Sequence, residues 1–461
     1  MKNNTAVILA AGAGTRMKSN IPKVLHKLCG YSMINHVIST VKDSGIEDII
    51  VVVGNGADQV KEELEKMHVT FAIQTELLGT AHAVLQAEES IPDGGNTVVL
   101  CGDMPLIKES TLKTFIEYHH QSGNSVSVLT AIMEDPFGYG RIIKDEKGNL
   151  LKIVEEKDGT EEELKTQEVN SGVYCFDTAF LKDNLKNVDN NNNQREYYLP
   201  DLVAIAVKDN CKVNSYLIDD SFEIMGINNR VQLAEAERIM RYNIVEEWMI
   251  KGVTFIDPDH AYIDKGVSIG RDTCIFPGVI LSRQTRIGEN CIIGQNSRIE
   301  NSIIENDVEI QNSVILDSQV GKRSTIGPFA YLRPHSHIGE DVKIGDFVEV
   351  KNSRIGNKSK ASHLAYIGDG EIGENVNIGC GVIFVNYNGK DKFKSIVEDG
   401  AFVGSNSNLV APVVIKKGGY VAAGTTVTME VPEDSLCVGR VKQRIIQGWR
   451  RNKSKETGGA K

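Results

Sequence analysis

The sequence lacks the patterns that crosslink small secreted proteins or hold a chain in a membrane. Its 8 cysteines are scattered, and no two of them form a Cys-x-x-Cys pair. A disulfide framework and a zinc knuckle are therefore not expected, which is typical of a reducing cytoplasm. No apolar run approaches the roughly 20 residues of a membrane-spanning helix, and the start of the chain lacks the apolar core of a signal peptide. We expect a cytoplasmic protein without a membrane partner.

The chain also lacks an excess of positive charge. Lysine and arginine total 51 against 62 aspartates and glutamates, which gives a net charge of −11. Nucleic acids and anionic membrane surfaces both attract basic proteins, so neither is an expected partner. Small anionic substrates remain compatible with this balance where arginine and lysine gather locally. With 461 residues, 41% of them hydrophobic, the chain can bury two cores, and we expect two domains and a connector.

Residues 1–229 alternate between short apolar runs and amphipathic stretches. Strand-like runs occur at residues 6–10, 49–53, 98–101 and 126–130, with helical patterns between them, as at residues 33–42 and 80–89. This alternation predicts a mostly parallel sheet that helices cover on both faces. Residues 230–250 then follow one continuous helical pattern, which we interpret as a linker helix between the first domain and a second domain at residues 251–461.

In residues 251–461 the period of the sequence changes to six. An aliphatic or small residue recurs every six positions, with occasional slips and one break: Ile263, Ile269, Ile275, Leu281, Ile287, Ile293, Ile299, Ile304, Ile310, Leu316, Val320, Ile326, Leu332, Ile338, Ile344, Val350, Ile355, Ala361, Ile367, Ile372, Ile378, Phe384, Val397, Val403, Leu409, Ile415, Val421 and Val427. Six residues fit a short strand and a corner, so three such units form one coil of a prism with aliphatic side chains on its axis. An antiparallel β domain would produce this spacing only by chance.

Glycine often follows the aliphatic residue of the repeat, as at Gly270, Gly288 and Gly356. Glycine adopts backbone conformations that other residues avoid. We therefore expect these glycines to supply the conformational freedom that the corners of the prism need.

A glycine-rich loop follows the first strand-like run. The segment Leu9-Ala10-Ala11-Gly12-Ala13-Gly14-Thr15-Arg16 consists largely of small residues. Such residues let backbone N–H groups close on a phosphate, and an arginine adds positive charge. The loop is not a P-loop, since it lacks Gly-Lys-Ser/Thr, nor a dinucleotide fingerprint, since Met17 replaces the third glycine. Lys23 follows at short range, where its ammonium could reach a triphosphate. Taken alone, the loop is also compatible with a purely structural turn.

A carboxylate follows the strand-like run at residues 98–101. Asp103 stands two positions after Cys101, at the end of the strand where open α/β sheets usually hold a divalent-metal ligand. Together with the glycine-rich loop, it resembles the signature of the sugar-1-phosphate nucleotidyltransferases. The resemblance implies one Mg²⁺ ion, held by Asp103 and Asn228, and UTP as a co-substrate.

The same resemblance extends along the first domain. Gln74, Gly79 and Thr80 match the uracil-binding positions of that family, and Gly140, Glu155 and Asn170 match its amino-sugar contacts. The implied nucleotide and sugar site comprises Leu9, Ala10, Ala11, Gly12, Arg16, Lys23, Gln74, Gly79, Thr80, Gly140, Glu155, Asn170 and Asn228. Each of these residues alone could be an ordinary turn residue, but their order and spacing agree throughout.

Polar residues also gather on successive repeats of the second half. Arg333 and Lys351 each stand one position after an inward aliphatic residue, so both are expected to point outward. His363, Tyr366 and Asn377 occupy other outward positions on neighbouring coils. An imidazole beside two cations, an aromatic hydroxyl and an amide favours a catalytic site over a solvated surface. The segment at residues 385–392 leaves the six-residue period and is expected to form a loop over a binding face.

That loop resembles the acyl-CoA loop of hexapeptide-repeat acyltransferases, and the whole chain resembles the bifunctional bacterial N-acetylglucosamine-1-phosphate uridyltransferase / glucosamine-1-phosphate N-acetyltransferase family. The resemblance implies a Rossmann-like α/β domain joined by a long helix to a left-handed parallel β-helix. It implies His363 as general base, Arg333 and Lys351 on the sugar phosphate, and Tyr366, Asn377 and Asn386 on the sugar. Acetyl-CoA would contact Cys380, Asn386, Tyr387, Ser405, Ala423 and Arg440.

Cys380 departs from the family pattern, since the family usually has alanine at this position. If the side chain packs against CoA, the cysteine would lower CoA affinity; if only the backbone contacts CoA, the change would have little effect.

The resemblance also implies two reactions: acetylation of glucosamine-1-phosphate by acetyl-CoA, then uridylyl transfer from UTP to N-acetylglucosamine-1-phosphate. It implies a homotrimer formed through the β-helix. The basic tail at residues 450–455 could cap a coil, reach a neighbour's CoA phosphate or be disordered. Two alternatives remain: a monofunctional nucleotidyltransferase with a structural or regulatory solenoid, and a non-catalytic scaffold.

Overall fold

The computed structural model describes residues 4–449, so the basic tail at residues 450–455 lies outside the described residues. The chain divides into two compact units between Arg241 and Tyr242, within helix α7 (Arg230–Ile250). This helix coincides with the linker helix expected over residues 230–250. No helix of the described part combines the length and the apolar character that a membrane crossing needs.

The first unit is built on a nine-stranded sheet, in which seven strands follow the order β11-β7-β10-β6-β1-β4-β5. The strands are β1 (Asn4–Ala10), β4 (Asp48–Val53), β5 (Thr70–Ile73), β6 (Asn96–Cys101), β7 (Val126–Ile132), β8 (Arg141–Lys144), β9 (Leu150–Val154), β10 (Glu168–Asp177) and β11 (Val213–Ile218). A separate hairpin pairs β2 (Lys27–Leu28) with β3 (Tyr31–Ser32). Strand β10 runs antiparallel to β6 and β7, whereas β1 runs parallel to β4 and β6. The sheet is therefore mostly parallel, as expected.

Helices cover both faces of this sheet because its strands are apolar on both sides. In β1, Ile8 belongs to one buried core and Val7 to the other. The helices are α1 (Met33–Asp43), α2 (Ala57–Glu63), α3 (Thr80–Leu85), α4 (Glu109–Ser122), α5 (Thr178–Asn184) and α6 (Asp201–Lys208). The Asp177 carboxylate caps α5 by accepting from two backbone N–H groups, and Gly123 ends α4 in the left-handed conformation. Helix α3 is shorter than the pattern at residues 80–89 predicted, since a 3₁₀ turn replaces its last part.

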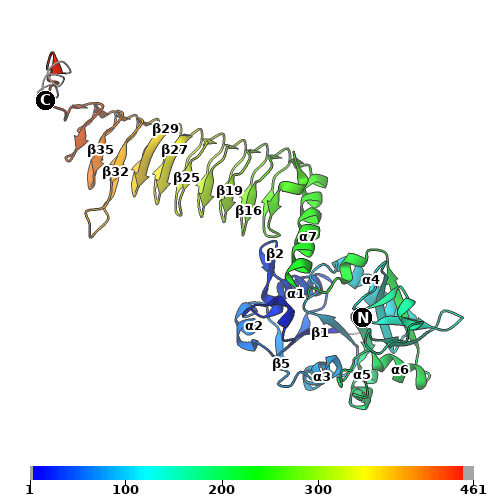
Figure 1. The fold of residues 1–461 in the computed structure, drawn as a ribbon. Coiled ribbons are helices and arrows are strands. Elements are labelled where there is room, and N and C mark those ends of the chain that lie inside the picture. The colour runs from blue at the N-terminus through cyan, green and yellow to red at the C-terminus, as the bar shows by residue number, and fades with distance from the viewer. Residues whose placement is uncertain (1–3, 450–461) are drawn as a thin grey trace, which may run out of the picture. The chain divides into compact units, whose positions relative to one another are not determined.

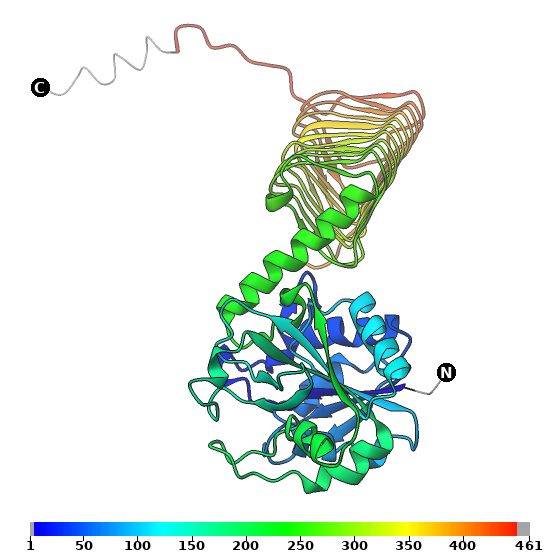
Figure 2. The same ribbon diagram turned by 90° about the vertical axis from the view of Figure 1, so that its right-hand side faces the viewer.

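The second unit is a left-handed parallel β-helix whose coils stack along one axis (Figures 1 and 2). It runs from β12 (Thr254–Phe255) to β39 (Leu436–Cys437), and each strand has two or three residues except β27 and β29. The strands used below are β25 (Tyr331–Leu332), β27 (Lys343–Lys351), β29 (Lys360–Gly368), β31 (Asn377–Ile378), β32 (Ile383–Val385), β34 (Phe402–Val403) and β37 (Tyr420–Val421).

Three faces make each coil triangular. We call the face with β31, β34 and β37 the first face, and the face with β25 and β32 the second face; a separate nine-stranded sheet forms the third. Strands β27 and β29 each run nine residues through the corner between the first and second faces. They therefore present outward side chains on both sides of one corner.

The six-residue period correctly identifies the side chains on the axis, with one exception. The buried core of this unit contains the expected column from Ile263 to Val427. Leu316 was expected in this column, but it is only partly buried and its neighbour Ile315 takes the axial place. The repeat therefore shortens by one residue on each side of Ile315, rather than by two residues after Leu316, because the inward residues are Ile310, Ile315 and Val320.

The glycines of the repeat were expected to supply conformational freedom at the corners, and this explanation was wrong. The corners adopt left-handed φ values mainly at asparagine, aspartate and other non-glycine residues, such as Asn296 and Asp307. At Gly270 a Cβ atom would lie 2.5 Å from the backbone of Gly288, one coil further on. Gly356 meets the backbone of Gly373 at 2.6 Å in the same way. These glycines are required because successive coils approach too closely for a side chain.

Candidate active sites

The glycine-rich loop lies at the carboxyl end of β1, next to the end of β6. Leu9 pairs with Cys101 across these strands, and the Gly102 N–H donates to the Leu9 carbonyl at 2.9 Å. Gly14 has φ +60°, and a Cβ atom on it would lie 2.8 Å from the Lys23 side chain. Glycine at this position therefore lets the loop fold back so that Lys23 stands beside Asp103.

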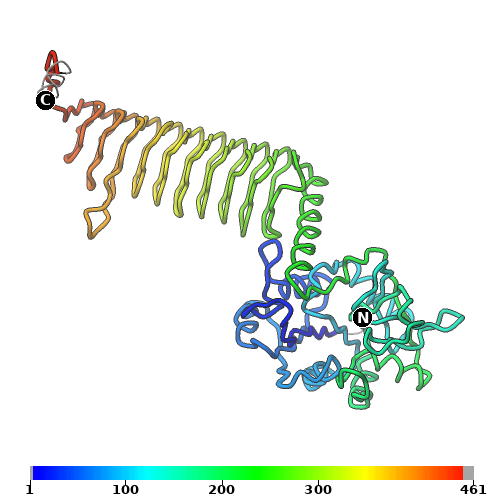
Figure 3. The backbone as a smooth tube through the Cα atoms, in the orientation of Figure 1, coloured from blue at the N-terminus to red at the C-terminus, as the bar shows by residue number. Residues whose placement is uncertain are grey.

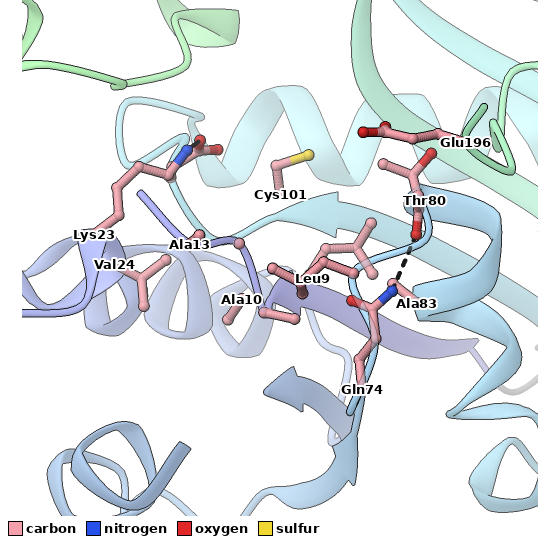
Figure 4. Close-up of a pocket in the computed structure, with 15 residues that line it drawn as sticks. Leu9, Ala10, Ala13, Lys23, Val24, Gln74, Thr80, Ala83, Cys101 and Glu196 are labelled. Atoms are coloured by element: carbon pink, nitrogen blue, oxygen red, sulfur yellow. Dashed lines mark hydrogen bonds and ion pairs between the residues drawn. The ribbon is translucent and has the colours of Figure 1, made fainter. Parts of the chain in front are cut away.

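A cavity of about 350 Å³ opens above these strand ends (Figure 4). The predicted residues among its walls are Leu9, Ala10, Ala11, Gly12, Lys23, Gln74, Gly79, Thr80 and Asp103, and the further wall residues include Cys101 and Glu196. Burial raises the pKa of the Cys101 thiol to about 12. This cysteine therefore stays protonated and is not a nucleophile.

The two predicted metal ligands are brought together by a cation of the protein itself. The Lys23 ammonium contacts the Asp103 carboxylate and also donates to Asn228 Oδ1 at 3.1 Å. Arg16 donates to the same Asn228 oxygen at 2.9 Å. One positive charge thus already sits between a carboxylate oxygen and an amide oxygen, which are hard ligands that suit Mg²⁺. The residues present fit a divalent cation at this position.

Gly79 and Thr80 form the wall of the cavity opposite Lys23. Gly79 has φ +119°, and a Cβ atom there would lie 2.5 Å from the Tyr197 carbonyl oxygen, so only glycine fits. The Thr80 hydroxyl accepts from the Leu199 N–H at 2.9 Å and so fixes this wall to the segment at residues 197–199. Gln74 is buried between these residues.

The three residues predicted to contact an amino sugar also meet. A Cβ atom on Gly140 would lie 3.2 Å from the Glu155 carboxylate and 3.4 Å from Asn170. Burial raises the pKa of Glu155 to about 7, and the neighbouring Asp158 and Asp201 carboxylates add to the shift. Burial likewise raises the pKa of Asp201 to about 6. This group of carboxylates was not predicted from the sequence, because Asp158 and Asp201 belong to no local motif.

In the β-helix, predicted acetyl-CoA residues form one row with His363 along the corner that follows the first face. Strand registers place Ile344, Ala361, Ile378, Val403 and Val421 side by side on the axis. The residues two positions further on are Asp346, His363, Cys380, Ser405 and Ala423. His363, Cys380, Ser405 and Ala423 are exposed. Arg440 joins the end of this row, where it donates to the Ala423 carbonyl at 2.7 Å.

Asp346, which no sequence motif marks, holds His363. The His363 Nδ1 atom lies 2.7 Å from Asp346 Oδ1 on the preceding coil, and this hydrogen bond lowers the pKa of the Asp346 carboxyl group. The pairing follows from the six-residue period, because both residues stand two positions after an axial residue. A carboxylate on Nδ1 orients the ring and leaves Nε2 free for proton transfer.

Lys351, Tyr366 and Asn386 come together on the second face. Gly368 lies between these side chains and leaves room for them. A Cβ atom on it would lie 2.5 Å from the Tyr366 hydroxyl and 2.7 Å from Asn386 Nδ2. The Asn386 amide also donates to the buried Asp369 carboxylate. These contacts fix the point at which the loop at residues 387–392 leaves the β-helix. Figure 3 shows this loop in orange, projecting from the coils.

The loop places a second cation, the Lys392 ammonium group, on this face. The pKa of Lys392 is lowered because the Lys351 amine lies within hydrogen-bonding reach and repels its positive charge. Two ammonium groups that converge in this way favour an anion between them. Arg333 stands on the preceding coil, beside Lys351 in the strand register, and donates to Glu349 at 2.9 Å.

The remaining predicted residues lie apart from this group within one chain. Asn377 stands on the first face, where it pairs with Lys360 of β29. Tyr387 is exposed in the loop, and its hydroxyl donates to the Gly389 carbonyl at 2.6 Å. A single chain thus brings together Lys351, Tyr366 and Asn386 but not Asn377.

Comparison with known proteins agrees with both units. The family described as nucleotidyl transferase matches residues 5–248, and the GMPPB C-terminal domain matches residues 244–361. The bifunctional protein GlmU of Clostridioides difficile (strain 630) is 54% identical over 98% of this chain and 99% of its own length. Its namesakes from Alkaliphilus metalliredigens (strain QYMF) and Alkaliphilus oremlandii (strain OhILAs) are 55% and 56% identical, over 96% and 97% of this chain and 97% and 98% of their own lengths. The chain therefore belongs to the family of the bifunctional proteins GlmU and carries a nucleotidyl transferase domain in its N-terminal half.

Proposed function

We propose that this enzyme makes UDP-N-acetylglucosamine in two steps at two separate sites. Residues 251–461 acetylate glucosamine-1-phosphate with acetyl-CoA. Residues 1–229 then join the product to the uridylyl group of UTP and release pyrophosphate, and residues 230–250 link the two domains. The observation that carries this proposal is the row of the β-helix in which the His363–Asp346 pair adjoins Cys380, Ser405 and Ala423.

At the first site, a phosphate oxygen of N-acetylglucosamine-1-phosphate attacks the α-phosphorus of UTP, and the bond to the β-phosphate oxygen breaks. Backbone N–H groups of the loop at residues 10–14 face the triphosphate, and Arg16 and Lys23 neutralise its charge. Asp103 and Asn228 would hold Mg²⁺, which when bound offsets the negative charge of the pyrophosphate leaving group. Gly140, Glu155 and Asn170 hold the amino sugar beside Cys101.

At the second site, the amine of glucosamine-1-phosphate attacks the thioester carbonyl of acetyl-CoA. His363 Nε2 takes the proton that the attacking nitrogen loses, while Asp346 holds the other ring nitrogen. The carbon–sulfur bond breaks, an amide forms, and the CoA sulfur leaves as the thiol with the proton that His363 returns. No covalent acyl-enzyme is required, so Cys380 acts as part of the wall.

Anion binding divides between the two sides of the corner. Lys351, Lys392 and Arg333 bind the sugar phosphate on the second face, with Tyr366 and Asn386 on the sugar. The row of Cys380, Ser405 and Ala423 takes the pantetheine arm, and Tyr387 and Arg440 lie where the rest of the coenzyme would pass. Asn377 reaches the sugar of a neighbouring subunit, since it lies apart from the second-face group.

A homotrimer in the cytoplasm completes the proposal. Phe329, Phe347 and Leu364 are exposed, and all three adopt left-handed φ values at one corner of the β-helix. Phe329 and Phe347 stack at 5.5 Å. Earlier coils carry Asn296 and Asn312 in the same left-handed conformation. An apolar ladder at strained positions is compatible with burial against other subunits.

One incubation tests the proposal. The enzyme is mixed with UTP, acetyl-CoA, glucosamine-1-phosphate and Mg²⁺, and the products are identified by mass. We expect UDP-N-acetylglucosamine from the wild type. The Asp103→Ala variant is expected to stop at N-acetylglucosamine-1-phosphate, and the His363→Ala variant to release no CoA thiol. A wild type that releases pyrophosphate from UTP and N-acetylglucosamine-1-phosphate but never releases thiol would instead indicate a monofunctional nucleotidyltransferase.

A further inference from the structure

The side-chain amide of Gln74 has only one chemically acceptable orientation. Gln74 is 4% exposed and follows the end of β5. Its amide nitrogen lies 3.2 Å from the Gly79 carbonyl oxygen (the dashed line in Figure 4) and 3.0 Å from His82 Nδ1. A carbonyl oxygen only accepts hydrogen bonds, so the NH₂ group must face Gly79 and His82.

The amide oxygen of Gln74 is therefore left for the cavity. In Figure 4 this oxygen points away from Thr80, toward the side of Leu9 and Ala10. Within residues 4–449 no hydrogen bond to it is recorded. An acceptor that faces the cavity without a protein donor selects a ligand that brings an N–H group. Uracil carries such an N–H at N3, whereas cytosine presents a lone pair at the same position.

His82 contacts the Gln74 amide nitrogen on the side away from the nucleotide cavity. It lies in the first turn of α3, half buried, with its ring centroid 6.4 Å from that of Tyr197. To accept from Gln74 at Nδ1, the ring must be neutral and carry its proton on Nε2. The Gln86 amide nitrogen lies 3.3 Å from Nε2, but it donates to the His82 carbonyl oxygen at 3.3 Å, so its contact with the protonated Nε2 is not a hydrogen bond. His82 itself lines a separate cavity of about 230 Å³, and it is absent from the walls of the nucleotide cavity.

We propose that His82 is a positioning residue that determines base specificity, by holding the Gln74 amide so that its oxygen faces the base. This inference rests on the proposed uridylyl transfer. If His82 cannot accept a hydrogen bond, only the 3.2 Å hydrogen bond to the Gly79 carbonyl still opposes rotation of the amide, and the rotated amide would present N–H to the cavity. Cytosine would then gain a partner that uracil loses, while binding of the triphosphate would stay the same.

The test compares kcat/KM for UTP and CTP in pyrophosphate release with N-acetylglucosamine-1-phosphate, using the full chain. His82→Phe keeps a ring against Tyr197 but removes the lone pair, and we expect the UTP/CTP ratio to fall at least about tenfold. His82→Asn places an amide oxygen near the position of Nδ1 and should keep the ratio within about threefold of wild type. Leu85→Ala is the matched control: it loosens the wall of the same cavity but leaves the Gln74–His82 contact in place.

The outcomes separate this inference from the proposed function. A wild type that turns over neither triphosphate would contradict the proposed function. A wild type that prefers UTP, with an unchanged ratio in a folded His82→Phe variant, would overturn the role of His82 alone. An equal loss of selectivity in Leu85→Ala would also overturn it, because general loosening would then explain the effect. If His82→Phe does not fold, His82→Gln replaces it, since its longer side chain carries the amide past the position of Nδ1.

Discussion

His363 and Asp346 act as one unit although 17 positions separate them in sequence. The carboxylate accepts from Nδ1 of the ring, and its lowered pKa keeps it ionised at neutral pH. An ionised partner on one ring nitrogen stabilises the positive charge that the ring acquires when the other nitrogen takes a proton. In the proposed mechanism, the strength of His363 as a base therefore depends on both residues.

Replacing Asp346 by asparagine should lower kcat for acetyl transfer about 10- to 100-fold, because the ring loses the charge that stabilises its protonated form. KM for acetyl-CoA should stay within about twofold, since Asp346 does not line the coenzyme path. Thiol release measures the first reaction and pyrophosphate release the second, which serves as the internal control. A rise in KM for acetyl-CoA as large as the fall in kcat would contradict a positioning role for Asp346.

Glu155 shows a different effect of burial. Its pKa is about 7 in the folded chain against an ordinary 4.5, so the folded state binds the proton more tightly than the unfolded state does. Stability from this group is therefore present at low pH and is lost as the pH rises from 4.5 to 7. Glu155→Gln should stabilise the first unit by up to about 3 kcal/mol at pH 8 and by little at pH 5.

Thermal unfolding at both pH values measures this difference, with Glu161→Gln as a control on an exposed residue. The same Glu155→Gln variant is expected to lose uridylyl transfer, since the wild type keeps an unfavourable buried carboxylate at this site. A variant that is equally stabilised at both pH values would show that the raised pKa is not the cause.

At the scale of the strand and corner, glycines serve two separate purposes. Gly270 has ordinary backbone angles but no space for a Cβ atom, whereas Gly400 has φ +67° and no atom within 4 Å. Gly270→Ala must push two coils apart and should cost about 3 kcal/mol or more. Gly400→Ala meets only the left-handed backbone penalty of about 1 kcal/mol. Urea unfolding of the two variants compares these costs, and equal costs would contradict the distinction.

The geometry of one coil determines which parts of the β-helix could be predicted from the sequence. Axial residues such as Ile344 and Ala361 repeat with the geometry of the coil, so the period identifies them without further information. The slip at Ile315 was misplaced because Ile315 and Leu316 are both aliphatic and either one fits the period. The close approach at Gly270 could not be seen, because it depends on the neighbouring coil rather than on local backbone preference.

The candidate sites were predictable to a similar degree. His363 stood out because two cations, a tyrosine and amides accompany it on neighbouring coils, whereas Asp346 is one of many acidic residues near corners. Lys392 lies in a loop whose path no period describes. His82 escaped notice because a histidine in a helix has many ordinary packing roles, and only the distance to Gln74 distinguishes it.

For the whole molecule, the apolar ladder of Phe329, Phe347 and Leu364 leads to a prediction about assembly. Asparagine tolerates the left-handed conformation better than phenylalanine does. A Phe329→Asn/Phe347→Asn variant should therefore stay folded but fail to form the proposed trimer. Light scattering should give the mass of one chain, and acetyl transfer should fall at least about tenfold while uridylyl transfer is unchanged. A variant that keeps the trimer mass would contradict assignment of the ladder to the interface.

The one-circuit spacing between Asp346 and His363 also limits how the length of this half of the chain can change. Both residues face the same direction only because the backbone makes one full turn of the prism between them. A single inserted residue within that turn would rotate every later side chain, unless a corner absorbed it. Insertions and deletions compatible with activity should therefore come as complete turns, or as bulges at corners like the one after Asn386.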